Sequence, residues 1–321
     1  MRRADYVIKR AIFALITIFV AITLNFFLFR VLPGNAVTDL ARVPHAGAQL
    51  RHALTVEFGL AKPKWQQYLL YLQQLVHGNM GVSFVNQQPV SNLLLTDLKN
   101  TVPMVTVGTL ASIVVGVFTG VLAAWRRGSI ADHISTNTAV FAYAFPTQWL
   151  GLMLLILLSS HLPTNGMTWE YLLSPEPFWQ HIGDVAQHMI LPALTLMLTA
   201  YGSYTLVVRT SVLETLGEDY VLTARAKGLP VRRIVWRHAV RNALLPMVTL
   251  IALDFGYIVG GALLVEVIFS WPGIGLAMYN AVTQRDYPML EGGFLILTIS
   301  VIVLNFASDL VYFRLDPRIT E

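Results

Sequence analysis

The amino-acid sequence contains no cysteine, which excludes disulfide bonds, thiolate metal sites and thiol nucleophiles. Charged residues are also scarce: Asp, Glu, Lys and Arg make up 12% of the 321 residues, about half the usual share. A soluble surface needs more charge, and disorder needs lower hydrophobicity than an apolar content of 55% and a mean hydropathy of +0.60. The composition therefore predicts a polytopic membrane protein.

Six apolar segments are each long enough to cross a bilayer as a helix, which takes roughly 20 residues. They are residues 11–29, 101–125, 134–160, 189–208, 243–265 and 292–313. Only the last two contain a charged residue, Asp254 and Asp309. No barrel-type alternation is present, so we expect an all-α fold with six transmembrane helices. Prolines at or inside these spans are expected either to kink or start helices or to act as hinges: Pro103, Pro146, Pro192 and Pro246.

The distribution of basic residues sets the orientation of these helices. With the N-terminus in the cytoplasm, the inner segments carry 15 of the 22 Lys and Arg residues. These segments are residues 1–10, 125–133, 209–241 and 314–321. Because basic residues collect in cytoplasmic loops, we expect an N-in, C-in topology. The net charge of +4 then reflects topology, and no nucleic-acid partner is expected.

This topology divides the chain into four parts. They are a cytoplasmic N-terminus (1–10), a first span (11–32), an external loop (33–99) and a five-helix core (100–321) that contains a cytoplasmic loop (212–241). In the external loop, residues 63–76 are expected to form a helix closed by Gly78. Its apolar face would hold Trp65, Tyr68, Leu69, Leu72 and Val76. This helix is packed on the membrane domain, or lies at the membrane interface, or is a platform for an external partner.

The cytoplasmic loop has the pattern of two helices joined by a tight turn. Apolar residues recur at helical spacing at Leu213, Leu216, Tyr220 and Ala224. Gly228 can end the first helix and Pro230 can begin the second. Arg233, Arg237 and Arg241 follow at intervals of four, where like charges repel slightly. They need a compensating partner, which is either lipid phosphate at the inner leaflet or an acidic protein surface.

The residues of this loop resemble the EAA loop of bacterial ABC-importer permeases. DYVLTARAKGL (219–229) and RHAVRNALLP (237–246) are similar to the dipeptide, oligopeptide and nickel branch of that superfamily, in particular to its first permease subunit. Two positions depart from the general motif, because Leu222 replaces its Glu and Thr223 replaces its first Ala. The stretch from Gly228 to Pro246 is also longer than in the general pattern. The substitutions and the longer stretch both resemble the peptide branch.

Further motifs of the same branch follow in order along the chain. They are LPGNAV (32–37), GNMGVSF (78–84), EVIFSWPGIG (266–275), RDYP (285–288) and SDLVYFRLDPRI (308–319). A single motif of this kind would be weak evidence. An ordered series over essentially the whole sequence identifies the chain as similar to this family throughout.

The resemblance implies a type I ABC-importer permease fold in the bacterial cytoplasmic membrane. The implied partners are a second homologous permease, two cytoplasmic ATPase subunits and an external peptide-binding protein. The cytoplasmic loop would dock on the ATPases through Tyr220, Ala224, Arg225, Ala226, Lys227, Gly228, Leu229 and Arg233. The chain has no G-x-x-x-x-G-K-[ST] loop, so ATP and Mg²⁺ would be bound by the ATPases. This chain would be a translocation subunit without catalytic residues or a cofactor of its own.

Two features outside the loop carry hypotheses. Asp254 lies near the middle of the fifth span, where a buried carboxylate is costly, and no other span offers Lys or Arg at matching depth. It either lines the translocation pathway and attracts cationic groups, or is protonated and hydrogen-bonded between helices. The resemblance assigns it no role. Trp271, Pro272 and Gly273 are expected to form a rigid turn at the outer mouth, with gating as the alternative.

No histidine has a metal-ligand spacing such as H-E-x-x-H. Six histidines lie outside in this topology, and each is expected to be a lone surface residue: His45, His52, His77, His161, His181 and His188. We therefore expect no metal site.

The leading hypothesis is one permease subunit of an ATP-driven importer, forming half of the pathway for di- and oligopeptides. The same architecture importing nickel, glutathione or a sugar-like solute is the first alternative, because specificity in such systems lies largely in the binding protein. A self-sufficient secondary transporter usually shows internal repeats and several intramembrane charges, which this sequence lacks. A non-transporting scaffold would leave six kinked spans unexplained.

Overall fold

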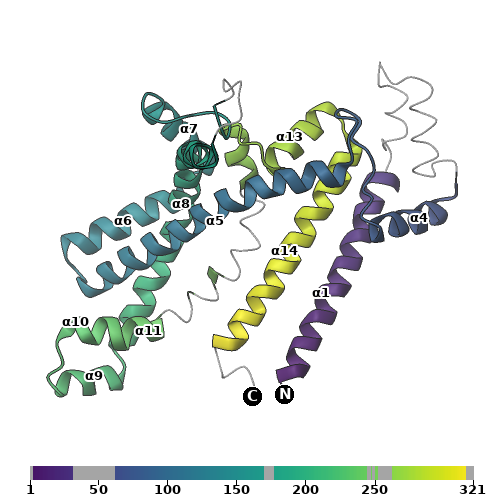
Figure 1. Ribbon diagram of the computed structural model, residues 1–321. Coiled ribbons are helices and arrows are strands. Elements are labelled where there is room, and N and C mark those ends of the chain that lie inside the picture. Colours follow the sequence, from purple (N-terminus) through teal and green to yellow (C-terminus); the bar gives the residue numbers. More distant parts are fainter. Residues whose placement is uncertain are drawn as a thin grey trace.

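The computed structural model of the protein describes residues 3–31, 62–169, 177–243 and 262–315, together with Met247, Leu250 and Ile251. Within these ranges the regular structure is helical, apart from an isolated bridge between Val82 and Pro89 (Figure 1). The helices are α1 (Arg3–Phe26), η1 (Phe27–Val31), α4 (Lys64–Val76), α5 (Val90–Trp125), α6 (Ile130–Ala144), α7 (Thr147–Leu158), α8 (Phe178–Leu216), α9 (Asp219–Ala226), α10 (Val231–Arg233), η2 (Ile234–Ala239), α11 (Val240–Ala243), α13 (Ile274–Gln284) and α14 (Tyr287–Leu315). The expected all-α class is confirmed for these ranges.

In the described part of the chain, four helical segments are long and apolar enough to cross a membrane. They are Asp5–Val31, α5, α8 and Tyr287–Leu310 within α14. They contain the first, second and fourth predicted spans and most of the sixth. The fifth predicted span (243–265) lies largely outside the described residues, so the count of six stays a prediction.

The third predicted span (134–160) is wrong as a single helix. α6 ends at Ala144, α7 begins at Thr147, and the two axes differ by 107°. Pro146 is the cause, because its ring forces the preceding residue out of the helical region. Phe145 accordingly has an extended backbone with ψ of 130°. Pro146 thus starts a helix, and the pair counts as a fifth crossing only if the bent segment is one span.

The core of the fold is the contact between α5 and α8. Small buried residues recur every four positions on one face of α5: Gly108, Ser112, Gly116 and Gly120. A Cβ atom at Gly116 would overlap the Cβ of Tyr204, and one at Gly120 would overlap the carbonyl of Thr205. Small residues at this spacing let two helix backbones approach closely within a membrane. Across the same contact the Thr119 and Thr205 hydroxyls lie 2.8 Å apart and share a hydrogen bond.

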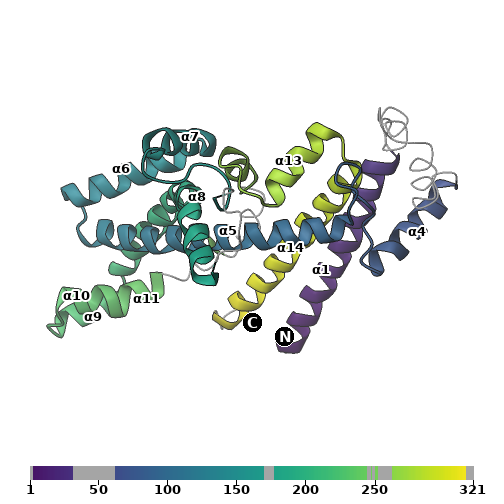
Figure 2. The same cartoon turned by 45° about the horizontal axis from the view of Figure 1, so that its top comes forward.

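The start of α1 and the end of α14 lie at the same end of the molecule as α9 and α10, and α4 and α13 lie at the opposite end (Figures 1 and 2). α1 and α14 run side by side between these ends, joined by a salt bridge of 3.3 Å between Arg10 and Asp309. The arrangement is compatible with the expected N-in, C-in topology, which places the termini and the 212–241 loop on one side.

The helix expected at residues 63–76 is present as α4, and it ends as expected before Gly78, whose φ is +73°. The apolar residues of α4 do not form its buried face. Trp65, Leu69 and Val76 are exposed, whereas Gln67 and Tyr71 are buried.

A buried polar cluster decides which face of α4 turns inward. Asn25 donates hydrogen bonds to the Tyr71 hydroxyl (3.1 Å) and to the Glu291 carbonyl (2.9 Å). The Arg30 guanidinium lies 4.7 Å from the centre of the Tyr71 ring and donates to the Glu291 carboxylate at 3.0 Å. Buried charges must be paired and hydrogen-bonded, and Tyr71 supplies part of that environment. α4 is therefore packed on the α1–α14 pair through polar contacts.

The absence of cysteine allows a direct test of topology. We expect Val76→Cys on α4 to react with a membrane-impermeant maleimide in intact cells, because its side chain is 85% exposed at the expected outer end. Lys227→Cys, which is exposed at the opposite end, should react only after the membrane is permeabilised. The unmodified chain provides the unlabelled control, and the reversed pattern would contradict the N-in orientation.

Candidate functional site

The 212–241 loop forms an elbow of two helical arms. The first arm is α9, and the sequence pattern predicted that it would continue from Leu213. It is instead separated from α8 by a break at Gly217 and Glu218, where Glu218 has an extended backbone with ψ of 148°. The second arm consists of α10, η2 and α11. Pro230 precedes this arm, and its carbonyl accepts hydrogen bonds from the backbone N–H groups of Arg233 and Ile234.

Gly228 makes the turn between the two arms. Its φ is +71°, in the left-handed region that favours glycine, as the sequence predicts. The Gly228 N–H donates to the Arg225 carbonyl at 2.9 Å, and the Leu229 N–H donates to the Ala224 carbonyl at 3.3 Å. These bonds satisfy carbonyls at the end of α9. A Cβ atom at Gly228 would meet nothing within 4 Å, so the glycine is required by backbone conformation and not by space.

The two arms share a small apolar core. Val221, Ala224 and Ile234 are buried together, with Leu216 and Leu229 packed against them. The second arm then continues into the larger core of the membrane helices. There Val235, Ala239 and Val240 pack with residues of α5 and α8, among them Val121 and Val208. The elbow is thus seated directly on the α5–α8 pair.

The residues expected to form a docking surface separate into two groups. Tyr220, Arg225, Ala226, Lys227, Gly228 and Arg233 are exposed. Ala224 is buried and Leu229 is half-buried, so both hold the elbow together.

Two exposed apolar residues of the elbow are not among the docking residues expected from the sequence. Leu222 is 51% exposed and Trp236 is 44% exposed. Leu222 was noticed only as a departure from the family motif. Large apolar side chains in a strongly charged loop are the signal that would have found both.

Several residues with predicted roles lie outside the described part of the structure. Asp254 lies outside the described residues, and so do the side chains of Arg237 and Arg241. The pathway role of Asp254 and the partner of the arginine row stay predictions.

The expected turn at Trp271, Pro272 and Gly273 is present at the end that carries α13. The Gly273 N–H donates to the Trp271 carbonyl at 2.7 Å, which makes a three-residue turn around Pro272. The turn is tied to α5, because the Trp271 indole donates to the Asn100 carbonyl (3.0 Å) and Asn100 donates to the Pro272 carbonyl (2.7 Å). Trp271 is fully buried, which suits a rigid turn.

A buried carboxylate lies under this turn. Glu266 accepts hydrogen bonds from the Thr101 hydroxyl at 2.6 Å and from the N–H groups of Gly275 and Leu276 at 2.6 and 3.1 Å. The two N–H groups belong to the first turn of α13, where a negative charge is favourable. A Cβ atom at Gly273 would overlap the Glu266 carboxylate, so only glycine allows this close approach.

Two family motifs meet beside the turn. Asp286 of the RDYP motif accepts hydrogen bonds from the Ser83 hydroxyl and from the Phe84 N–H (3.1 Å) in the GNMGVSF motif. Residues 81–89 are thereby held against the connection between α13 and α14.

One histidine expectation is wrong. His188 is 2% exposed, and its Nδ1 lies 3.0 Å from the Asp184 carboxylate, one helical turn earlier on α8. Asp184 also accepts a hydrogen bond from the Trp169 N–H at 2.9 Å. The pair fastens the 162–169 segment to α8. Within the described ranges, no three His, Asp or Glu side chains converge as metal ligands would.

The chain is similar to known membrane transport proteins over nearly its whole length. Residues 113–321 match the model of the family described as "binding-protein-dependent transport system inner membrane component". The chain is 38% identical to the dipeptide transport system permease protein of Escherichia coli (strain K12), over 97% of this chain and 98% of that protein. It is 36% identical to an oligopeptide transport system permease protein of Bacillus subtilis (strain 168), over 98% and 99%. A glutathione transport system permease protein of Escherichia coli is 32% identical over 98% of both chains.

The Glu266 contacts generate a stability prediction. In Glu266→Gln, an amide nitrogen replaces one of the two accepting oxygens and leaves a buried donor unsatisfied. We expect a loss of about 1–3 kcal/mol in stability, the usual cost of an unsatisfied buried group. Thermal unfolding in detergent would measure it, with Glu214→Gln at an exposed position as the matched control. Equal melting temperatures for the two variants would contradict the role of the carboxylate.

Proposed function

Because the chain belongs to the family of binding-protein-dependent transport system inner membrane components, we propose that it is a permease subunit of an ATP-driven importer of di- and oligopeptides. Paired with a second homologous permease, it forms half of the translocation pathway in the bacterial cytoplasmic membrane. Peptides reach it from an extracytoplasmic binding protein. Two cytoplasmic ATPase subunits bind ATP and Mg²⁺ and hydrolyse ATP.

The elbow is the single observation that carries the mechanical part of the proposal. Its turn exposes Arg225, Lys227 and Gly228, while its second arm is packed into the α5–α8 core. A partner that grips the turn and moves therefore moves the membrane helices with it. Close-packed interiors transmit such displacements, because they do not deform continuously. In this way closure of the ATPases reorients the pathway from one membrane face to the other.

The docking surface consists of the exposed members of the predicted set and the two exposed apolar residues, Leu222 and Trp236. The basic residues suit an acidic groove on the ATPase. The apolar pair adds contact area that excludes water, which is the usual basis of binding energy.

A second cargo class has a specific observation in its favour. One relative at 32% identity is named as a glutathione transport permease, so related permeases serve different solutes. Import of glutathione or another small solute by the same architecture is therefore the alternative. A self-sufficient secondary transporter is disfavoured by membership in a binding-protein-dependent family.

Asp254 is proposed to line the pathway and to attract cationic groups of the cargo. Replacement of Asp254 by Asn removes the charge with little change in shape. We expect uptake of Lys- and Arg-containing peptides to fall relative to uptake of neutral peptides, measured in vesicles that carry the whole importer. Unchanged uptake of both kinds of peptide would leave Asp254 with a hydrogen-bonding role only.

Gly228 offers the sharpest test of ATPase docking. A β-branched residue at its left-handed backbone costs roughly 1–2 kcal/mol, which shifts the population of the native turn by about tenfold. We expect Gly228→Val to lower peptide-stimulated ATP hydrolysis by about tenfold in the reconstituted importer.

The matched control is Gly128→Val. Gly128 has φ of +77°, equally open space around its Cβ position and a place outside the elbow, between α5 and α6. It imposes the same kind of strain without touching the turn. Equal losses in both variants would show that the effect is strain alone and that the elbow is not the docking element.

A further inference from the structure

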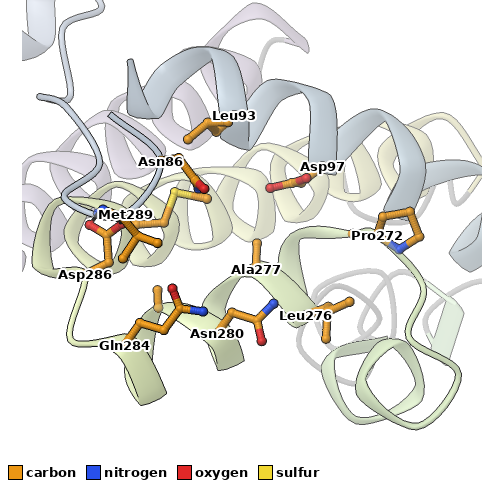
Figure 3. A pocket seen from close by; sticks show the side chains of 13 residues that line it. Asn86, Leu93, Asp97, Pro272, Leu276, Ala277, Asn280, Gln284, Asp286 and Met289 are labelled. Carbon is orange, nitrogen blue, oxygen red and sulfur yellow. Dashed lines mark hydrogen bonds between the residues drawn. The ribbon is translucent and has the colours of Figure 1, made fainter. Parts of the chain in front are cut away.

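A cavity at the end opposite the elbow has no part in the features described so far. Its volume is about 260 Å³, and it lies between residues 85–86, the first turns of α5 and the helix α13. Figure 3 shows Asp97 from α5 facing Asn280 and Gln284 from α13 across this space, with Asn86 and Met289 at one side. The two connections that enclose it are fixed, one by the turn at Pro272 and the other by the Asp286 contacts with Ser83 and Phe84.

Asp97 is the unusual group in this cavity. Its side chain is half-buried, and no described residue donates a hydrogen bond to its carboxylate or forms an ion pair with it. The neighbouring carboxylates of Glu266 and Asp286 are by contrast each held by several donors. A carboxylate that is partly removed from water is stabilised by a counter-charge, so the site suits a cationic group.

The residues that line the cavity indicate what kind of charged group would suit it. Among the described residues that line the cavity there is no Lys, Arg or His, so this lining disfavours anions. Its walls include the apolar side chains of Leu93, Leu276 and Met289, which suit a hydrocarbon stem better than a hydrated metal ion. Asn86, Asn280 and Gln284 are exposed at the rim, where their amides can bond to peptide groups of an approaching chain.

A free dipeptide fits this lining poorly. It carries a carboxylate as well as an ammonium group, and the described lining provides no cation to receive that carboxylate. The volume is also below the roughly 300–1,000 Å³ of pockets that enclose drug-sized ligands. A single basic side chain on a larger protein brings positive charge alone, and its aliphatic stem is compatible with apolar walls.

We propose that this cavity is a socket for a Lys or Arg side chain presented by the extracytoplasmic binding protein, with Asp97 as its counter-ion. The inference rests on the proposed function, because a binding-protein partner is what the family description names. The socket lies between part of the 33–99 loop, α5 and the turn at Trp271–Gly273. A binding protein that occupies it therefore contacts α5, the helix on which the elbow also packs.

The test measures affinity of the binding protein for the whole importer in nanodiscs. A hydrogen bond to a charged group typically contributes enough for about a tenfold change in affinity. We expect Asp97→Asn to raise Kd about tenfold, with near-normal maximal ATP hydrolysis at saturating binding protein. The control is Lys99→Gln, at an exposed position two residues further on α5 that does not line the cavity. Long-range electrostatics would make Lys99→Gln strengthen binding by a similar factor, whereas the socket predicts little change.

A charge exchange identifies the partner residue. Asp97→Lys should abolish tight binding, and one Lys→Glu or Arg→Glu variant of the binding protein should restore it. Unchanged Kd in Asp97→Asn would overturn the socket. Direct binding of labelled dipeptide to the importer, measured without the binding protein, provides a second check. If Asp97→Asn abolishes this dipeptide binding but leaves the affinity for the binding protein unchanged, the socket is overturned and the cavity is assigned to cargo. If the unmodified importer shows no ATP hydrolysis dependent on the binding protein, the proposed function fails, and that outcome is distinct from failure of the socket.

Discussion

The close contact between α5 and α8 is the constraint on which the rest of the structure depends. The stripe from Gly108 to Gly120 removes side-chain volume from one face of α5, so that the backbone of α8 can lie against it. In a membrane there is no hydrophobic gain from bringing two apolar helices together, and close packing has to supply the attraction. The pair then serves as a base for both ends of the molecule. The second arm of the elbow packs on it at one end, and Asn100 and Thr101 hold the Trp271 turn at the other.

Buried polar groups at the end of the molecule that carries α13 hold together segments that are distant in sequence. Glu266 joins α5 to α13, Asp286 joins residues 83–84 to the start of α14, and Glu291 joins α14 to Arg30. Removing one partner of such a group is strongly destabilising, because the other is left buried without compensation. These contacts therefore specify one arrangement of the external connections. Asp97 stands out against this background, since it is the carboxylate near the turn that the described residues leave without a donor.

Features determined by neighbouring residues were predictable from sequence, and features determined by distant ones were not. Gly228 and Pro230 define the elbow through local backbone preferences, and Pro146 predicts a helix start for the same reason. The size of the bend at Pro146 depends on what α7 packs against, which no local pattern states. The buried face of α4 does not follow from its apolar pattern, because the groups that contact Tyr71, Asn25 and Arg30, lie far away in the chain, while Trp65 is exposed. The cavity at Asp97 needs three separate segments to exist at all, so a single sequence gives no sign of it.

The two arms of the elbow differ in how extensively they pack on the membrane helices, and this difference indicates which helices would move with the elbow. η2 and α11 are embedded in the α5–α8 core, so displacement of the second arm moves that pair as a unit. α9 is separated from α8 by the break at Gly217 and Glu218, and the core that it shares with Leu216 and Ile234 is small. The first arm can therefore adjust to a partner's surface while the second arm transmits force. Since α5 continues from this core to the Thr101–Glu266 contact, the same helix connects the elbow at one end of the molecule to the Trp271 turn at the other. In the proposed importer, a permease that responds to partners on both sides of a membrane needs one element of this kind, and α5 has the length, the packing and the polar contacts beside the turn to be that element.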